Sequence, residues 1–138
     1  MMGKRWARAD GKRPIMVDGS PASSTNPATW AGFTDVQRGA GNGYGIMLGD
    51  GLGCYDLDNV VDADGSLSDL AVEVIAGIVE PVIFAERSVS GRGVHVFVRA
   101  AEAPGCRRPL VGGAAVERYS RARFIRVTGE RVEVAAGA

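Results

Sequence analysis

One strong helical pattern lies in the middle of a chain that otherwise reads as short strands, and this order is what most constrains the fold. Between Ser66 and Val79, apolar residues recur at the i, i+3, i+4 and i+7 spacing of an amphipathic helix. Ser66 and Asp69 have the spacing of a capping box at its start, and Pro81 follows its end. Strands on both sides of one helix favour an α+β fold with a mostly antiparallel sheet.

The rest of the chain consists of short apolar runs separated by turns. A loop is expected over residues 18–27 and a second, shorter helix over residues 27–38. A length of 138 residues suffices for one core, so we expect a single domain over residues 1–138. Its basic N-terminus, 1–13, could be flexible, and residues 130–138 would form a C-terminal tail. The predicted strands cover residues 45–48, 52–58, 82–86, 94–98, 115–119 and 124–128.

Charge is distributed unevenly along a chain whose formal net charge is zero. Nine acids and no Lys or Arg lie between residues 50 and 86, whereas ten Arg and three acids lie between residues 87 and 131. The chain as a whole is no polycation, but an acidic block beside basic ones suits a metal site flanked by phosphate-binding surface. The polar start and the lack of a long apolar run predict no signal peptide, no membrane association and a cytoplasmic location.

The strand predicted over residues 52–58 ends on two carboxylates, Asp56 and Asp58. Because side chains alternate along a strand, residues i and i+2 share a face, so the two carboxylates are expected side by side. Adjacent like charges repel and are stabilised by a cation, and hard oxygen ligands suit Mg²⁺ or Mn²⁺. Taken alone, an Asp-x-Asp pair is more often a pair of ordinary surface acids.

A loop of Ser, Gly and Arg residues leads into the strand predicted over residues 94–98. Its glycines let backbone N–H groups approach an anion, and Ser88, Ser90 and Arg92 add donors that suit phosphate. His95, the only histidine of the chain, follows the loop directly. A lone histidine is usually a structural residue, but this position favours a role in binding.

A third acid, Glu117, lies in the strand predicted over residues 115–119, close to several arginines. Two interpretations are open from the residue type alone. Glu117 is either a third metal ligand or a surface carboxylate paired with arginine.

Taken in order, these motifs resemble the archaeo-eukaryotic primase superfamily, whose signature is hydrophobic-Asp-x-Asp, then small-x-His, then hydrophobic-acid. The wider context, from about Lys12 to Gly129, is similar to the phage and plasmid primase–polymerase branch. One departure is Gly93 at the small position, so that any serine contact to a triphosphate would come from Ser88 or Ser90. The matching segments are Tyr55-Asp56-Leu57-Asp58, Gly93-Val94-His95 and Val116-Glu117, with Lys12-Arg13-Pro14, Asn26-Pro27-Ala28-Thr29-Trp30, Arg123-Phe124 and Thr128-Gly129 around them.

The resemblance implies a DNA-directed nucleotidyltransferase that adds NTP or dNTP to a primer 3′-hydroxyl in phage or plasmid DNA replication. It implies an RRM-like antiparallel sheet with packed helices and an N-terminal α/β extension. Its partners would be single-stranded template and primer, with a replicative helicase or a helical accessory domain as further candidates, in the cytoplasm or nucleoid of a bacterial host. The implied catalytic set is Asp56, Asp58, Glu117 and His95, in which the three acids hold two Mg²⁺ or Mn²⁺ ions; the implied nucleotide-binding residues are Ser88, Ser90, Arg92, His95, Lys12, Arg13 and Arg123.

Two other classes of function use the same residues. A metal-dependent nuclease or phosphoesterase could employ the acids, although a rolling-circle endonuclease would need a His-hydrophobic-His motif that a chain with one histidine lacks. A non-catalytic RRM-like module could bind single strands or dock on a helicase. That module would expose aromatic residues for stacking, and its acids would oppose DNA unless a metal neutralised them.

Overall fold

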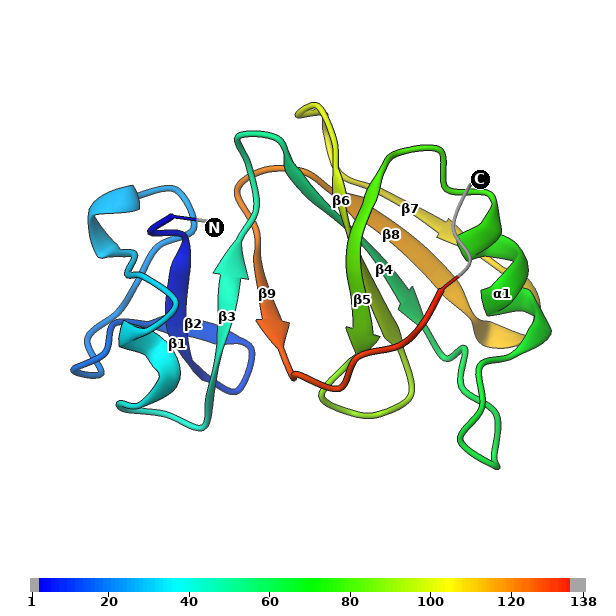
Figure 1. The fold of residues 1–138 in the computed structure, drawn as a ribbon, viewed down its shortest axis with the longest axis horizontal. Helices are drawn as coiled ribbons and strands as arrows, with labels where there is room; N and C mark the ends of the chain where they lie inside the picture. Colours follow the sequence, from blue (N-terminus) through cyan, green and yellow to red (C-terminus); the bar gives the residue numbers. More distant parts are fainter. Residues whose placement is uncertain (1–2, 135–138) are drawn as a thin grey trace. The chain divides into compact units, whose positions relative to one another are not determined.

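The computed structural model describes residues 3–134, which contain nine strands, arranged in two antiparallel sheets, and one α-helix (Figure 1). This arrangement confirms the predicted α+β class with mostly antiparallel strands. The residues group into two compact units, which we call the first unit (residues 3–49 and 122–128) and the second unit (residues 50–121 and 129–134).

The first unit contains a four-stranded sheet with the strand order β2-β1-β3-β9. Its strands are β1 (Trp6–Asp10), β2 (Arg13–Ile15), β3 (Gly43–Met47) and β9 (Phe124–Val127). Most of the buried side chains of these strands are small or aliphatic. The described residues of the unit contain no α-helix. The core residues of this unit are Trp6, Ala7, Ala9, Ile15, Val36, Ile46, Met47, Leu48, Ile125 and Val127.

The basic N-terminal segment includes the strand Trp6–Asp10, in which buried Arg8 donates to three backbone carbonyls at 2.8–3.2 Å. One expectation for this unit is wrong, and the error has a tertiary cause. The helix expected over residues 27–38 is replaced by two 3₁₀ turns, η1 (Pro27–Thr29) and η2 (Asp35–Gln37). Ala31, midway between them, exchanges both backbone hydrogen bonds with Trp6, which interrupts any helix.

The second unit contains a five-stranded sheet with the order β5-β6-β4-β8-β7. The helix α1 (Asp69–Ala76) lies against one face of this sheet (Figure 1). Apolar residues from alternate positions of the strands pack against α1, among them Leu57, Val96 and Val116. The remaining elements are β4 (Leu52–Asp58), β5 (Val82–Arg87), β6 (Val94–Arg99), β7 (Cys106–Pro109), the 3₁₀ turn η3 (Val111–Gly113) and β8 (Ala115–Tyr119).

The helix α1 is shorter than the segment Ser66–Val79 that the pattern predicted. Ser68 is the N-cap, and its side chain accepts a hydrogen bond from the Ala71 amide at 3.1 Å. Ser66 instead donates its hydroxyl to Asp64, which stabilises a turn before the helix. A serine that closes a local turn through a neighbouring Asp cannot also cap the helix two residues later.

The segment after Gly129 continues along the outer edge of β5 as far as the described residues reach. Arg131 forms a bridge with Glu86, and the Val132 amide donates to the Ala85 carbonyl at 2.9 Å. The tail expected over residues 130–138 is thus ordered against the sheet at 130–134, and its remainder lies outside the described residues. Within residues 3–134, none of the helices has both the length and the apolar character needed to cross a membrane.

Candidate active site

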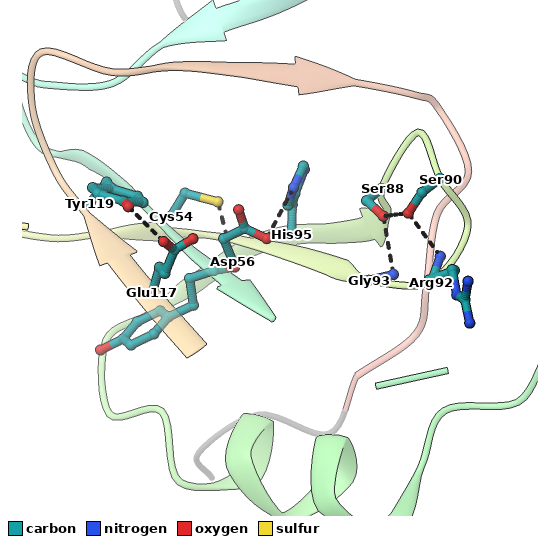
Figure 2. Close-up of polar contacts among 10 residues, drawn as sticks. Cys54, Asp56, Ser88, Ser90, Arg92, Gly93, His95, Glu117 and Tyr119 are labelled. Atoms are coloured by element: carbon teal, nitrogen blue, oxygen red, sulfur yellow. Dashed lines mark hydrogen bonds and ion pairs between the residues drawn. The ribbon is translucent and has the colours of Figure 1, made fainter. Parts of the chain in front are cut away.

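The sheet register of the second unit places three of the predicted site residues side by side. β4 pairs with β6 and β8, and its Asp56 is the direct partner of His95 on β6 and of Glu117 on β8. Directly opposite residues of antiparallel strands project from the same face of the sheet. Because Leu57, the next residue of β4, packs in the core with α1, Asp56, His95 and Glu117 occupy the other face (Figure 2).

Three carboxylates from β4 and β8 converge on this face. One oxygen each of Asp56, Asp58 and Glu117 can be chosen so that all three lie within 4.8 Å of one another; we call these residues the carboxylate cluster. The side chains of Asp56 and Glu117 are each 17% exposed, so water screens their repulsion only in part. Three hard oxygen donors at this spacing could together hold a metal ion.

His95 borders the cluster on the side opposite Glu117. Its Nε2 atom lies 3.3 Å from Asp56 Oδ1, close enough for an ion pair but not aligned as a hydrogen bond. Asp56 Oδ1 and His95 Nδ1 are both buried polar atoms that have no hydrogen-bond partner among residues 3–134. Buried polar atoms normally find partners. Two such atoms beside a carboxylate cluster are what a site for a metal and a polar ligand would leave open.

Glu117 is fixed by a residue that the motif analysis did not single out. The Tyr119 hydroxyl donates to Glu117 Oε1 at 3.0 Å, and Tyr119 is two residues further along β8 on the same face (Figure 2). Arg107 on β7 places its Nε atom 4.0 Å from the same oxygen. The rule of alternation could have identified Tyr119 from the sequence, since it is at i+2 from Glu117.

We expect Tyr119→Phe to weaken the binding of Mn²⁺, because the phenol holds the Glu117 carboxylate beside Asp56. Partners in the outer shell of a metal site typically change affinity by about tenfold or more. Titration of Mn²⁺ by electron paramagnetic resonance would measure the dissociation constant.

Tyr55→Phe is the matched control for this change. It also removes a phenol that donates to a carboxylate, Glu80 Oε1 at 2.7 Å, but on the face that carries α1. An equal loss of Mn²⁺ affinity in both variants would contradict the role given to Tyr119.

The loop between β5 and β6 bonds largely to itself. The Ser88 amide donates to the Gly93 carbonyl and the Gly91 amide to the Ser88 carbonyl, while the amides of Arg92 and Gly93 donate to the hydroxyls of Ser90 and Ser88. These four amides do not form the open anion nest that the loop composition suggested. The Arg92 side chain points away from the carboxylates in Figure 2. The two hydroxyls lie 3.2 Å apart at one end of the same sheet.

The small position of the small-x-His motif is a glycine, Gly93, for a steric reason. A Cβ atom at this position would lie 2.6 Å from the Leu57 carbonyl oxygen, in the backbone of the neighbouring strand β4. Real Cβ atoms do not approach a backbone oxygen so closely. A serine here would push β6 away from β4, where His95 and Asp56 meet, so packing requires the glycine.

Two further polar residues lie on this face and are fully buried. Burial raises the pKa of the Cys54 thiol well above its ordinary value, and the negative charges of Asp56 and Glu86 raise it further, so Cys54 remains a protonated packing residue. Glu86 is the register partner of His95 on β5, and its carboxylate accepts the Gly129 amide at 3.1 Å. The sequence analysis did not single out Glu86, although it is two strand positions before the Ser/Gly/Arg loop.

Three predicted nucleotide-binding residues, Lys12, Arg13 and Arg123, belong to the first unit. Lys12 lies in the turn between β1 and β2, and Arg13 pairs with Asp10 at 2.8 Å. Arg123 precedes β9, where its carbonyl accepts the Leu48 amide. Their part in nucleotide binding stays a prediction.

Known proteins resemble this chain over most of its length. Residues 5–137 match the family model described as bifunctional DNA primase/polymerase, N-terminal. The chain is 31% identical over 123 residues to a DNA primase-polymerase of Nitratiruptor phage NrS-1, a match that covers 82% of this chain and 17% of the phage protein. It thus spans about a sixth of that relative. Because the family match includes every strand that carries the site, this chain belongs to the family of N-terminal domains of bifunctional DNA primase/polymerases.

Proposed function

We propose that this chain catalyses template-directed transfer of a nucleotide from NTP or dNTP to the 3′-hydroxyl of a primer. The observation that supports the proposal most is the carboxylate cluster with His95 on its flank, on the sheet face opposite α1. Phosphoryl transfer depends mainly on positioning and on stabilisation of charge, and a compact set of carboxylates with one imidazole supplies both.

Each site residue has a distinct part in this proposal. Asp56, Asp58 and Glu117 would hold two Mg²⁺ or Mn²⁺ ions, with Asp56 in the centre because it adjoins both of its partner strands. When bound, such ions lower the pKa of an attacking hydroxyl and neutralise the developing charge on the phosphates. His95 would donate a hydrogen bond to the triphosphate, and the hydroxyls of Ser88 and Ser90 and the Arg92 guanidinium would bind its outer phosphates. Template, primer and nucleotide are the proposed partners, with a helicase or helical domain as a further candidate.

The test is extension of a labelled primer on a single-stranded template with Mg²⁺ or Mn²⁺, beside a primer-free reaction. We expect nucleotide addition that stops when EDTA removes the divalent ion and resumes when the ion is restored. If the primer-free reaction gives no product, a preformed primer–template or a helical domain supplied in trans should restore synthesis.

Other results would favour the rival functions. Metal-dependent shortening of the labelled strand would identify a nuclease. Binding of single strands without addition or cleavage, under every condition, would identify a non-catalytic module.

A further inference from the structure

The edge strand β7 carries two adjacent arginines that project from opposite faces of the sheet. All four residues of β7 (Cys106–Pro109) are exposed. Arg107 is the register partner of Glu117 and therefore shares the face of the carboxylate cluster, whereas Arg108 pairs with Val116, a core residue on the face of α1. The sequence analysis missed this strand because a short polar run that ends in proline has no strand signal.

Arg107 completes a line of residues across four strands. His95, Asp56, Glu117 and Arg107 are successive register partners on β6, β4, β8 and β7, and we call them the transverse row. Three strand spacings of about 4.8 Å place the two ends of this row about 14 Å apart. The imidazole lies at one end, the guanidinium at the other, and the carboxylate cluster between them.

The Arg107 guanidinium is available to a ligand. Its side chain is 59% exposed, and its Nε atom lies 4.0 Å from Glu117 Oε1, at the outer limit of an ion pair. A pair of this length, with one partner largely exposed to water, contributes little to stability. A phosphate group, which binds the planar guanidinium through two hydrogen bonds, can displace such a contact.

The in-line geometry of phosphoryl transfer indicates which phosphate Arg107 can contact. In phosphoryl transfer the attacking and leaving oxygens lie on opposite sides of the phosphorus atom. If the triphosphate extends from the cluster towards His95 and the Ser/Gly/Arg loop, the primer 3′-oxygen approaches from the side of β8 and β7. We propose that Arg107 binds a backbone phosphate of the primer strand and so positions the primer terminus; this inference rests on the function proposed above.

The test compares Arg107→Ala with Arg108→Ala, since both variants lose one positive charge from the same strand but from opposite faces. Fluorescence anisotropy with a labelled primer–template measures binding without requiring chemistry. We expect Arg107→Ala to raise the dissociation constant about tenfold, the effect of one charge-assisted contact, and to reduce the slope of log K against log salt by about one. Arg107→Lys should recover part of the affinity. Arg108→Ala should leave both quantities near the wild-type values.

Kinetics of primer extension then distinguish an effect on primer binding from an effect on nucleotide binding. Arg107→Ala should raise the KM for primer–template and leave the KM for nucleotide unchanged. A raised KM for nucleotide with unchanged primer binding would overturn the inference and assign Arg107 to the triphosphate. Equal losses of primer–template affinity in Arg107→Ala and Arg108→Ala would also overturn it, because the loss would then come from net charge alone. If the wild-type chain extends no primer under any condition, the proposed function fails, while the anisotropy comparison still decides whether Arg107 binds the strand.

Discussion

Replacing Asp56 and Asp58 together with asparagine is expected to abolish nucleotide addition. The double substitution keeps the size and shape of both side chains and removes two of the three negative charges of the carboxylate cluster. Without those charges the cluster cannot hold a pair of divalent ions, whose charge stabilisation is worth several kcal/mol. Loss of that stabilisation corresponds to about a thousandfold lower rate or more. Single-nucleotide addition to a labelled primer, measured at saturating Mn²⁺, gives the rate.

The same variant should bind single-stranded DNA as well as the wild-type chain or better. Two like charges that face the phosphates would be gone, and their repulsion with them. The matched control is Asp62→Asn with Asp64→Asn, which removes two charges from the exposed loop between β4 and α1. This control should retain nucleotide addition. Full activity of the Asp56/Asp58 variant, or equal loss in the control, would show that the cluster is not the metal site.

The central strands of the second unit could be predicted because their sequence pattern and their burial agree. β4, β6 and β8 alternate between side chains that face α1 and side chains on the other face, and the expected ranges differ from the observed ones by at most one residue. The Asp56 and Asp58 pair followed from this alternation alone. Local pattern is a reliable guide where one face of a strand packs on a core.

The strands that were missed owe their structure to pairing rather than to local pattern. β1 contains Arg8, and a charged residue in the sequence predicts a surface position. In the structure its guanidinium is buried because it donates to three backbone carbonyls of residues 36–40. β7 is exposed along its whole length and is a strand only because it pairs with β8. Tertiary hydrogen bonds of this kind leave no periodic signal in the sequence.

The strand patterns alone also could not predict that the three motifs lie next to one another in space. Alternation places Glu117 on one face or the other of its own strand, but only the register of β8 against β4 brings it opposite Asp56. A register shift of one residue would turn every side chain of a strand to the other face. In the sequence analysis it was the resemblance to a family, not the spacing, that joined Asp56, His95 and Glu117. The register of the sheet provides the physical reason for that association.

His95→Ala is expected to weaken nucleotide binding by about one to two orders of magnitude, the range for loss of a hydrogen bond to a charged group. The imidazole is only 10% exposed, and its Nδ1 atom has no hydrogen-bond partner in the described part of the chain. In the proposed function it donates to a ligand at the end of the transverse row opposite Arg107. Binding of a fluorescent nucleoside triphosphate, measured in the presence of Ca²⁺ so that no turnover occurs, gives the dissociation constant.

A second variant and two further measurements distinguish a ligand contact from an indirect effect. His95→Gln preserves much of the side-chain volume, so a loss of nucleotide affinity in both variants with unchanged melting temperatures would exclude misfolding as the cause. Because His95 Nε2 lies 3.3 Å from Asp56 Oδ1, removal of the imidazole could also act through Asp56, which we propose as a metal ligand. Mn²⁺ titration separates the two effects: a direct contact lowers nucleotide affinity while leaving Mn²⁺ affinity near the wild-type value. Unchanged nucleotide affinity in His95→Ala would show that the imidazole does not bind the triphosphate. The triphosphate would then have no reason to extend towards His95, nor the primer to lie beside Arg107.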